Sequence, residues 1–474
     1  MSLGLWPEKW SAFGPERVAI VWTPTGERWT YRELWRRARH AAAWLRDVHG
    51  VRAGDRVAWH TGNRPEFFAA LFACARLGAI LVPINWRLAP PEVSWILGDC
   101  RPRVVLDEEA VLSIPHAGPA PAVALAPVED ATPVMILYTS GTTGRPKGAL
   151  LTHGMLAWNS VNTTQACDLR ADDSTLTFTP LFHTGAVNVL SLPLLHRGGK
   201  VVLMPRLDTA AALAWVERER VTSLFGVPTT FEMLRDDPGF AAADLSSVRF
   251  ALCGGAAAPL GLIHDWAGKG VVFRQGFGLT EVGPNCFSLP PEDALRKAGT
   301  VGFPCFHVRA RLVDGAGREV GPGEVGELQL AGPVVCGGYW ENPAATAEAL
   351  RDGWWATGDL FTVDDEGYYR VVGRKKEMFK SGGENVYPAE VEQALLQHPR
   401  VKEAAVVGVP DARWGEVGRA YVSPADLDPE ELRRFLRERI AGFKVPRAFV
   451  PLPALPRNAM GKVVRAALEA VVSA

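Results

Sequence analysis

Short strands and amphipathic helices alternate over the first part of the chain, and this alternation limits the folds open to it. The pattern predicts helices over Arg32–Val48 and Pro65–Leu77, and strands over Arg56–Trp59 and Ile80–Ile84. In the first helix the apolar residues recur every three to four positions, as a buried helix face requires. Strands that alternate with helices in this way form a parallel sheet covered by helices. The sequence therefore predicts an α/β layered fold for this region.

After about Gly302 the sequence changes character, because alternating apolar residues and dense Gly and Pro predict antiparallel β structure. A compact α+β unit follows. Its expected helices are Pro388–Leu396 and Pro429–Ile440, and its expected strand is Glu403–Val409. Val371–Lys376, between the two regions, is interpreted as a connector.

The chain is thus expected to be an α/β (α+β) multidomain protein. A large N-terminal domain, residues 1–373, would hold layered α/β subdomains and a β-rich subdomain. A hinge over residues 374–376 would join it to a small mobile C-terminal α+β domain, residues 377–474.

The composition excludes several classes of protein. The 474 residues are 47% hydrophobic and 22% charged, with a formal net charge of -1, as in a globular protein that does not bind nucleic acid. The seven cysteines include no CxxC pair, so we interpret them as small buried residues in a reducing compartment. Residues 1–20 lack a signal-peptide pattern, and no apolar run has the length of a membrane helix. We expect a cytoplasmic protein with no integral membrane segment; its oligomeric state stays open, a homodimer included.

A strand-like run, Val134–Tyr138, breaks into a loop rich in glycine and hydroxyl residues, Tyr138–Gly148, with the sequence YTSGTTGRPKG. Glycines let the backbone turn tightly and present N–H groups to an anion. The hydroxyl groups add donors, and the lysine adds a positive charge. These groups suit the phosphates of a nucleotide, although their spacing is not that of a Walker A loop. The candidate phosphate-binding residues are Thr139, Ser140, Gly141, Thr142, Thr143, Gly144 and Lys147.

This loop closely resembles the phosphate loop of the adenylate-forming superfamily, which includes acyl- and aryl-CoA synthetases, luciferases and the adenylation domains of peptide synthetases. The resemblance covers nearly the whole chain, because further motifs follow in the family's order. It implies an ATP-dependent acid–CoA ligase, of the acyl-CoA synthetase branch, that forms an acyl-adenylate and pyrophosphate and then acyl-CoA and AMP. The implied cofactors are ATP, Mg²⁺ and coenzyme A, and the implied partners are these small molecules and a carboxylic acid.

Two more segments resemble nucleotide-binding motifs of the family. The first would form a wall for adenine and comprises Gly254, Gly255 and Ala256. The second comprises Gly276, Phe277, Gly278, Thr280 and Glu281. By resemblance, Thr280 would bind the α-phosphate and Glu281 would hold Mg²⁺, a cation that prefers carboxylate and phosphate oxygens.

The later motifs extend the resemblance. Asp359 would accept hydrogen bonds from both ribose hydroxyls, and Arg374 would donate to the same sugar. Lys376 matches the family's hinge position, about which the small domain would turn. In the segment KSGGENVYP, Gly382 and Gly383 would line the coenzyme A channel, and Lys380 is a further cofactor-binding candidate.

Two further residues complete the catalytic set that the resemblance implies. Lys462, in PRNAMGK, would contact the attacking carboxylate and the α-phosphate, where one cation neutralises developing charge. His183, in PLFHTG, would lie near the carboxylate. The catalytic candidates are therefore Lys462, His183, Thr280 and Glu281.

The identity of the acid is less constrained. By resemblance, the candidates for its pocket are His183, Val187, Val227, Pro228, Gly254 and Gly276. Most are small or apolar, which indicates a neutral, hydrophobic acyl group. Amino-acid activators of the superfamily place an Asp near the position of His183, so an amino acid is disfavoured. We expect a medium- to long-chain fatty acid first and an aryl or o-succinylbenzoate-type acid second. The gating Trp of some long-chain relatives is absent, since Val187 lies in that region.

Two rival functions use the same fold. A non-catalytic nucleotide-binding protein would be expected to lack the catalytic cation or the metal ligand, yet Lys462 and Glu281 are both present. A luciferase-like oxidative use of the adenylate shares the first half-reaction and differs in its independence of coenzyme A.

Overall fold

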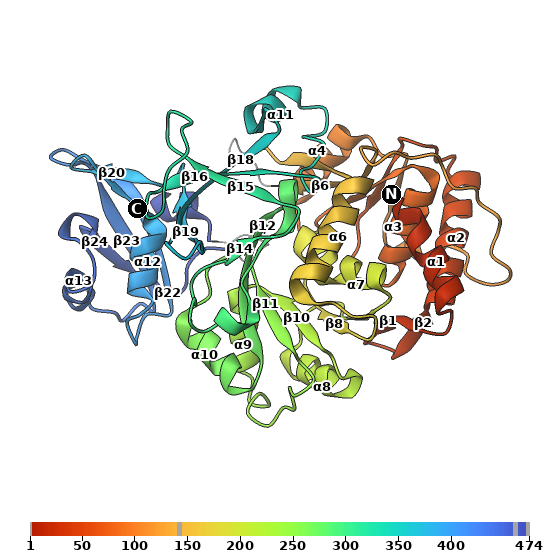
Figure 1. Cartoon of the computed structure of the whole chain (residues 1–474), viewed down its shortest axis with the longest axis horizontal. Coiled ribbons are helices and arrows are strands. Elements are labelled where there is room, and N and C mark those ends of the chain that lie inside the picture. The colour runs from red at the N-terminus through yellow and green to blue at the C-terminus, as the bar shows by residue number, and fades with distance from the viewer. Residues whose placement is uncertain (1, 140–144, 458–462, 471–474) are drawn as a thin grey trace. The chain divides into compact units, whose positions relative to one another are not determined.

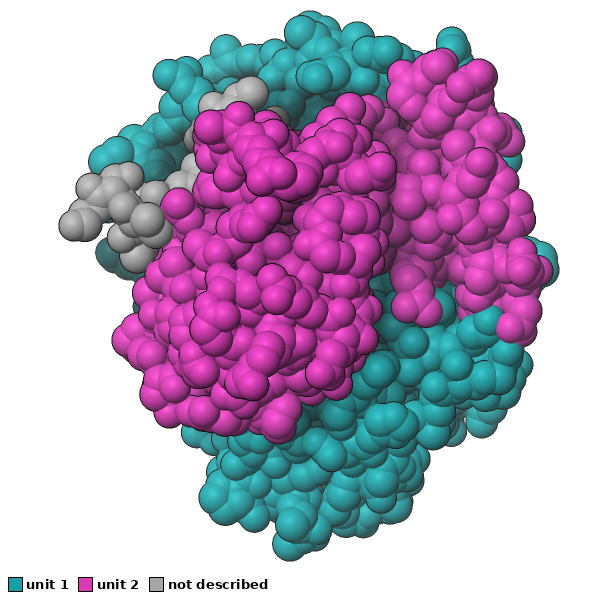
Figure 2. All heavy atoms as spheres, turned by 90° about the vertical axis from the view of Figure 1, so that its left-hand side faces the viewer, with its two compact units in different colours: residues 1–310, 330–355 teal, residues 311–329, 356–474 magenta. Residues whose placement is uncertain are grey.

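The computed structural model describes residues 2–139, 145–457 and 463–470. The chain divides into two compact units, coloured separately in Figure 2. Unit 1 comprises residues 1–310 and 330–355, and unit 2 comprises residues 311–329 and 356–474. The domain division expected at residues 374–376 stays a prediction. The α/β multidomain fold class is confirmed by the sheets described below.

The first part of unit 1 contains a five-stranded sheet with the order β5-β3-β4-β6-β7. β3 to β6 pair in parallel, and β7 pairs antiparallel with β6. The expected α/β layering is present, with α2 and α3 side by side (Figure 1). The strands are β3 Arg56–Trp59, β4 Ile80–Pro83, β5 Val104–Leu106, β6 Pro133–Thr139 and β7 Lys147–Thr152. The helices are α2 Tyr31–Asp47, α3 Glu66–Leu77, α4 Pro90–Cys100 and α5 Glu108–Leu112.

A nine-stranded sheet forms the rest of the core of unit 1, in the order β14-β13-β12-β11-β10-β8-β9-β1-β2. Its parallel strands are β8 Ser174–Thr177, β9 Lys200–Leu203, β10 Ser223–Gly226, β11 Phe250–Cys253 and β12 Val272–Leu279. β1 Val18–Trp22 pairs in parallel with β9. The antiparallel partners are β2 Glu27–Thr30, β13 Gly283–Ser288 and β14 Phe303–Pro304. Strands β8 to β11, at the centre of this sheet, are almost wholly buried.

Helices flank these strands, and the rings of Phe231, Trp266 and Phe273 pack together in the core beside them. The other α-helices of the described part of unit 1 are α1 Trp6–Phe13, α6 His153–Cys167, α7 Leu192–Arg197, α8 Thr209–Glu219, α9 Pro228–Arg235, α10 Leu260–Gly268 and α11 Pro343–Ala349. A π-helical segment, η2, spans Gly185–Ser191. Short 3-10 turns are η1 Leu3–Leu5, η3 Thr280–Val282 and η4 Pro291–Asp293.

The β-rich region forms a sheet with the order β15-β16-β18-β17, and β19 also pairs with β18. The strands are β15 Arg309–Val313, β16 Gly326–Ala331, β17 Leu350–Arg351, β18 Trp354–Val363 and β19 Tyr369–Arg374. β18 pairs antiparallel with both β17 and β19, as the sequence predicted for this region. The expected connector Val371–Lys376 is wrong over its first four residues, which belong to β19. Hydrogen bonding to β18, rather than a local pattern, makes this short segment a strand.

Unit 2 ends in a sheet with the order β21-β20-β23-β22, with β24 paired to β23. Its strands are β20 Phe379–Ser381, β21 Glu384–Val386, β22 Glu403–Asp411, β23 Gly415–Ser423 and β24 Ala448–Pro451. Its helices are α12 Pro388–Leu395, α13 Pro429–Arg437, η5 Gly442–Lys444 and α14 Arg465–Ala470. Each of the first two begins at the expected proline, and Asp428 accepts a hydrogen bond from the Glu430 N–H at 3.0 Å.

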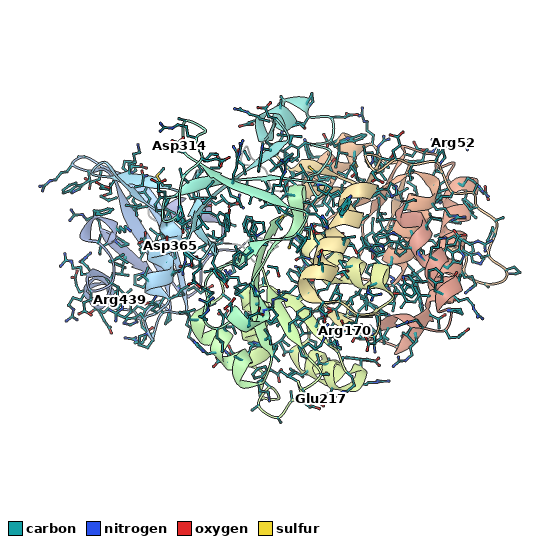
Figure 3. The ribbon with its side chains drawn as sticks, in the orientation of Figure 1. Arg52, Arg170, Glu217, Asp314, Asp365 and Arg439 are labelled. Carbon is teal, nitrogen blue, oxygen red and sulfur yellow. The ribbon has the colours of Figure 1, made fainter. Side chains whose placement is uncertain are left out.

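All seven cysteines are buried thiols, which confirms the interpretation of them as small core residues. Charged side chains such as Arg52, Arg170 and Glu217 are exposed (Figure 3). Within residues 2–139, 145–457 and 463–470, no helix combines the length and the apolar character needed to cross a bilayer.

Candidate active site

The glycine- and hydroxyl-rich loop connects two paired strands. Thr139 ends β6, Lys147 begins β7, and these two residues are partners in an antiparallel register. β6 and β7 therefore form an antiparallel hairpin, with Thr139 and Lys147 paired at its end. Of the predicted phosphate-binding residues, Ser140, Gly141, Thr142, Thr143 and Gly144 lie outside the described residues.

Glu281 lies beside this hairpin although it is far away in sequence. Its Oε1 accepts hydrogen bonds from the Thr139 hydroxyl at 3.3 Å and from the Tyr339 hydroxyl at 3.0 Å. The Nζ of Lys147 lies 5.2 Å from the centroid of the Tyr339 ring, within reach of a cation–π interaction. The structure thus brings together the predicted metal ligand and the two described ends of the predicted phosphate loop.

Tyr339 was missed by the sequence reasoning. It follows a glycine pair in GGYW, in a segment without a polar motif, and only its contacts with distant residues single it out. Burial raises the pKa of Tyr339, so its hydroxyl stays protonated and can donate to a carboxylate.

The strand that precedes Glu281 requires a glycine at position 278. β12 turns directly into β13 through η3, with Leu279 paired to Gly283. A Cβ at position 278 would lie 2.3 Å from the carbonyl oxygen of Pro284, a distance that side-chain carbons do not adopt. The absence of a side chain at Gly278 therefore permits the tight turn that presents Thr280 and Glu281.

The predicted adenine wall begins where β11 ends. Gly254 follows Cys253, whose partner across the parallel pair β11–β12 is Gln275. Gly254 and Gly276 are therefore adjacent positions at the same edge of the sheet. Gly255 has φ +78°, a left-handed conformation that favours glycine, and both it and Ala256 are exposed.

The residues predicted near the acyl group lie around η2. His183 is half-buried, with its ring centroid 5.4 Å from that of Phe182, and its carbonyl accepts N–H groups at the start of η2. The π-helical segment is a rare geometry that is common at functional sites. Within it, the side chain of Val187 is fully buried. Val227 is half-buried at the start of α9, and Pro228, the first residue of that helix, is buried.

Phe225, at the end of β10, is a second residue that the sequence reasoning missed. Its ring lies against two glycines, because a Cβ at Gly185 would be 2.9 Å from Cε1 and a Cβ at Gly254 would be 3.4 Å from Cε2. The ring and the two glycines form an apolar wall that joins the π-helical segment to the predicted adenine wall. The strand pattern alone could predict an aromatic residue in β10. It could not predict which glycines the aromatic ring contacts.

In unit 2 the predicted ribose ligands are brought together. Asp359 of β18 and Arg374 of β19 are partners in the antiparallel register, and Arg374 Nε lies 2.6 Å from Asp359 Oδ1. The Asp359 side chain is 5% exposed and that of Arg374 is 40% exposed. The Asp359 N–H donates to the hydroxyl of Thr357 at 3.1 Å, which fixes the strand at this point. A buried carboxylate and a half-exposed guanidinium thus form one polar pair.

The remaining predicted residues of unit 2 lie on exposed turns. Lys376 is exposed in the turn that follows β19, and Lys380 is exposed in β20. Gly382 (φ +62°) and Gly383 (φ +88°) form the two-residue turn between β20 and β21, where both central residues need left-handed backbone. The backbone conformation therefore favours glycine at both positions, and the coenzyme A channel stays a prediction. Lys462 lies outside the described residues.

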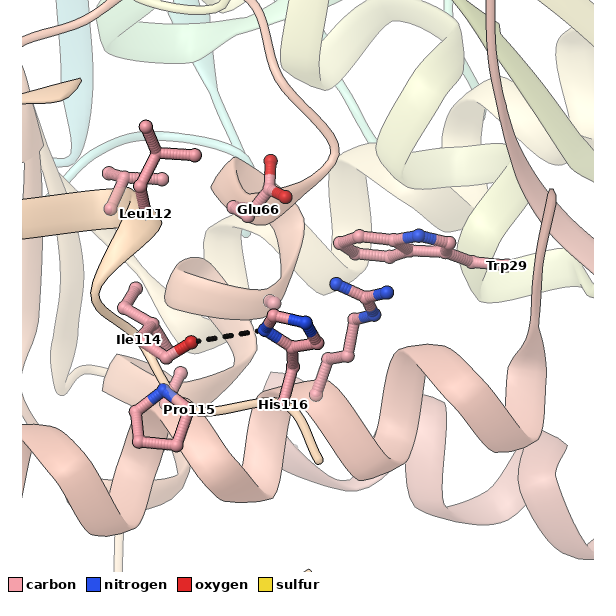
Figure 4. A pocket seen from close by; sticks show the side chains of 10 residues that line it. Trp29, Glu66, Leu112, Ile114, Pro115 and His116 are labelled. Atoms are coloured by element: carbon pink, nitrogen blue, oxygen red, sulfur yellow. Dashed lines mark hydrogen bonds between the residues drawn. The ribbon is translucent and has the colours of Figure 1, made fainter. Parts of the chain in front are cut away.

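A pocket elsewhere in unit 1 contains none of the predicted site residues. It lies among β2, α2, α3 and the segment after α5, where Glu66, Ile114 and His116 line it (Figure 4). The Arg37 guanidinium at its edge stacks on Trp29 at 4.2 Å and is paired with glutamates. The charge of Arg37 is therefore already paired within the protein. Because no predicted site residue lines this pocket, we assign it no part of the predicted chemistry.

Two family models match the chain. The family model described as "AMP-binding enzyme" matches residues 7–340, and "AMP-binding enzyme C-terminal domain" matches residues 390–462.

Similar proteins cover almost the whole chain. A feruloyl-CoA synthase of Amycolatopsis sp is 44% identical over 98% of this chain and 97% of its own length. An indoleacetate–CoA ligase of Aromatoleum aromaticum is 40% identical over 98% of this chain and 96% of its own. The long-chain-fatty-acid–CoA ligase FadD13 of Mycobacterium tuberculosis is 35% identical over 97% of this chain and 96% of its own.

Among solved structures, the o-succinylbenzoate CoA synthetase of Bacillus subtilis in complex with its acyl-adenylate intermediate has a TM-score of 0.90 at 31% identity. The match covers 98% of this chain and 97% of that one. The same enzyme has also been solved with ATP and a magnesium ion.

Proposed function

The chain belongs to the AMP-binding enzyme family and is an AMP-forming acid–CoA ligase, and we propose that its acid carries an aromatic ring close to the carboxyl group. The observation that carries this proposal is the likeness to the feruloyl and indoleacetate ligases over nearly the full chain, at 44% and 40% identity. Both of those proteins are named for acids in which a short spacer joins an aromatic ring to the carboxyl carbon.

The apolar wall of Phe225, Gly185 and Gly254 supports an aromatic acid. A flat ring fits against a phenyl group and glycine backbone, with offset or edge-on contact between the rings. The wall begins near His183, the residue predicted to lie beside the carboxylate. A ring held at a short distance from that histidine matches an aryl acid with a short spacer.

The first half-reaction forms the acyl-adenylate. A carboxylate oxygen of the acid attacks the α-phosphorus of ATP, a new P–O bond forms, and the bond to the β-phosphate breaks to release pyrophosphate. In this proposal Lys147 and the hydroxyl of Thr139 bind the phosphates, Thr280 donates to the α-phosphate, and Lys462 neutralises charge on the attacking and bridging oxygens. Their work is positioning and charge neutralisation.

Glu281 fits the role of a magnesium ligand. In nucleotide sites Mg²⁺ is held by one or two carboxylates together with substrate phosphates and water, and Glu281 would hold it here, where it would supply positive charge that neutralises the phosphates. Among the residues that the structure describes, no three His, Cys, Asp or Glu side chains form a metal cluster, so a single carboxylate with phosphate oxygens is the fitting arrangement. The two hydrogen bonds on Oε1 orient the Glu281 carboxylate.

The nucleoside part of ATP has its own ligands in the proposal. Gly254, Gly255 and Ala256 would face adenine, and Asp359 with Arg374 would hold the ribose hydroxyls. The pair is suited to this, because the buried carboxylate is already oriented by the guanidinium.

The second half-reaction transfers the acyl group. The thiol sulfur of coenzyme A attacks the acyl carbon, loses its proton, and AMP leaves. We assign Lys380, Gly382 and Gly383 to the coenzyme A channel and Lys376 to a hinge that moves the residues after it between the two half-reactions. The exposed turn around Lys376 can absorb a change of a few backbone torsions.

A medium- to long-chain fatty acid, which the apolar pocket candidates favoured first, is the second candidate. Its supporting observation is the 35% identity to a long-chain-fatty-acid–CoA ligase. That identity is lower than the identity to the two aryl-acid ligases, so we place the aromatic acid first.

Pyrophosphate release from ATP, measured with a panel of acids and with and without coenzyme A, tests the function. The proposal expects release that depends on an aryl acid such as ferulate or indoleacetate, with multiple turnover only when coenzyme A is added. Release that no acid stimulates would favour the non-catalytic nucleotide-binding protein. Sustained turnover without coenzyme A would favour the oxidative use.

A further inference from the structure

Tyr339 contacts two groups that the proposed chemistry uses. Its hydroxyl donates to Glu281 Oε1 at 3.0 Å, and its ring centroid lies 5.2 Å from Lys147 Nζ. One side chain therefore touches both the carboxylate assigned to the metal and the ammonium assigned to the phosphates. Neither contact involves residues near position 339 in sequence.

The backbone around Tyr339 is fixed to the strand that carries Lys147. Tyr339 forms a β-bridge with Ala149, and the Leu150 N–H donates to the carbonyl of Gly338 at 2.9 Å. The Tyr339 N–H donates to the hydroxyl of Thr346 in α11 at 2.9 Å. The tyrosine is thus held at a set position relative to β7.

The ring of Tyr339 is also packed. It lies edge-on to Trp355, with the centroids 5.5 Å apart. Because the ring and the main chain are both held, the hydroxyl has little freedom and can serve as a fixed donor. A donor held by its surroundings orients a ligand more precisely than a mobile one.

We propose that Tyr339 is a positioning residue that orients the Glu281 carboxylate for magnesium and holds Lys147 for the phosphates of ATP. This inference rests on the proposed function, since it takes the roles of Glu281 and Lys147 from it. Tyr339 acts through these residues, not on the reacting atoms.

The hydrogen bonds to Glu281 support this assignment. Thr139 and Tyr339 both donate to Oε1, so they set the orientation of the carboxylate without using the lone pairs of Oε2. Partners that orient a metal ligand in this way commonly change metal affinity or activity by about 10- to 100-fold when they are removed.

The contact to Lys147 has a separate consequence. An ammonium and a carboxylate attract strongly in a partly buried site, and direct pairing would reduce the charge that each offers to a ligand. The face of an aromatic ring gives the ammonium a weaker partner that a phosphate can replace. The ring of Tyr339 therefore keeps Lys147 near the site and available.

Two substitutions separate these effects. Tyr339→Phe removes the hydroxyl and keeps the ring and its packing, whereas Tyr339→Leu removes both. Tyr31→Phe is the matched control, because it also removes a hydrogen-bonded tyrosine hydroxyl, one that donates to the Gly199 carbonyl at 2.7 Å and contacts no proposed site residue.

The experiment uses Mn²⁺ as a probe for Mg²⁺. Electron paramagnetic resonance measures the affinity of Mn²⁺ for the protein in the presence of a non-hydrolysable ATP analogue. We expect Tyr339→Phe to weaken Mn²⁺ binding by about 10-fold or more and to raise the Mg²⁺ concentration for half-maximal pyrophosphate release by a similar factor. The KM for the acid and the urea midpoint should stay unchanged. Tyr339→Leu should in addition raise the KM for ATP at saturating Mg²⁺.

A double-mutant cycle with Glu281→Gln tests whether the tyrosine acts through the glutamate. If it does, Tyr339→Phe adds little to the loss already caused by Glu281→Gln. Wild-type Mn²⁺ affinity in Tyr339→Phe, an equal loss in Tyr31→Phe, or additive losses in the cycle would overturn the inference. A wild-type protein that releases no pyrophosphate with any acid would instead overturn the proposed function, so the two failures are distinct.

Discussion

Arg374 Nε lies 2.6 Å from Oδ1 of Asp359, across two antiparallel strands. The aspartate side chain is almost fully buried and the arginine is partly exposed, so the carboxylate is held from one side by a fixed cation. This pair is the proposed set of ribose ligands, and it gives the first prediction.

Asp359→Asn should weaken ATP binding. An amide replaces a charged acceptor, and a hydrogen bond to a charged group contributes about 1.5–3 kcal/mol, which corresponds to a rise of roughly 10- to 100-fold in the KM for ATP. The KM for the acid should change little. Steady-state pyrophosphate release at varied ATP measures both.

The control for this prediction is Asp426→Asn, which removes the carboxylate of an exposed ion pair with Arg400 in the same unit. Exposed pairs contribute little, so this variant should keep the wild-type KM for ATP. An unchanged KM in Asp359→Asn, or an equal rise in the control, would contradict the ribose assignment.

This pair also shows how much of the candidate site could be predicted from the sequence. The motifs around Asp359 and Arg374 predicted a common ligand, but the last four residues of the strand that brings them together were expected to belong to a connector. Its six residues contain no periodic signal, and pairing with β18 decides their structure. A local motif can therefore identify the residues of a site even when the strand that carries them is not predicted.

Elements with strong local signals were predicted well. The helices that begin at Pro388 and Pro429 were expected because proline suits the first position of a helix, and the structure starts them there. Tyr339 and Phe225 were missed for the opposite reason. Their importance lies in contacts with Glu281, Lys147 and Gly254, which no local pattern records.

Gly278→Ala should destabilise the protein and lower its activity. The new Cβ would lie 2.3 Å from the Pro284 carbonyl oxygen, so the backbone between β12 and β13 must shift. Forced overpacking of this kind costs about 1–3 kcal/mol. Urea unfolding measures the loss of stability, and pyrophosphate release measures the displacement of Thr280 and Glu281.

Gly261→Ala is the matched control, since a Cβ there meets nothing within 4 Å and the residue lies in α10. Alanine favours helix over glycine by up to about 1 kcal/mol, so this variant should be as stable as the wild type or more so. A stable and fully active Gly278→Ala would show that the turn does not need a glycine.

Stability should fall in mild acid because desolvation keeps two histidines neutral, the buried His153 and the half-buried His196. Desolvation lowers the pKa of His153 to about 4 and that of His196 to about 4. His153 Nδ1 accepts the Leu3 N–H at 3.2 Å, and His196 stacks on Trp6. A histidine whose folded pKa is below its unfolded pKa binds more protons when unfolded, so its contribution is complete above about pH 6.5 and is lost as the pH falls towards 4.

From pH 7.5 to pH 5, each histidine should therefore reduce the free energy of unfolding by about 2 kcal/mol. Urea unfolding at the two pH values measures the change. His153→Gln should remove about half of it, while His264→Gln, at an exposed position, should leave it unchanged. If the urea midpoint does not change between pH 7.5 and pH 5, the assignment of neutral histidines is refuted.

Lys462→Ala should separate the two half-reactions. Loss of one cation aimed at the transition state costs about 100-fold or more in rate, so adenylate formation should nearly cease. Thioester formation from a supplied acyl-adenylate should persist, because the lysine is assigned to the first step alone. Chromatography of AMP and acyl-CoA measures both half-reactions. An equal loss of both would contradict the assignment of Lys462 to adenylate formation alone.

The ratio of kcat/KM for an aryl acid to that for a fatty acid, with ATP, Mg²⁺ and coenzyme A present, tests the central claim most directly. Ferulate, indoleacetate and dodecanoate are suitable acids, and mass spectrometry of the acyl-CoA product identifies the reaction. We predict that one of the aryl acids gives its coenzyme A thioester with a kcat/KM at least about 10-fold above that of dodecanoate, the ratio expected when a pocket differs by about 1.4 kcal/mol between two substrates. A preference for dodecanoate would contradict the aromatic assignment, and the absence of any thioester would contradict the ligase itself.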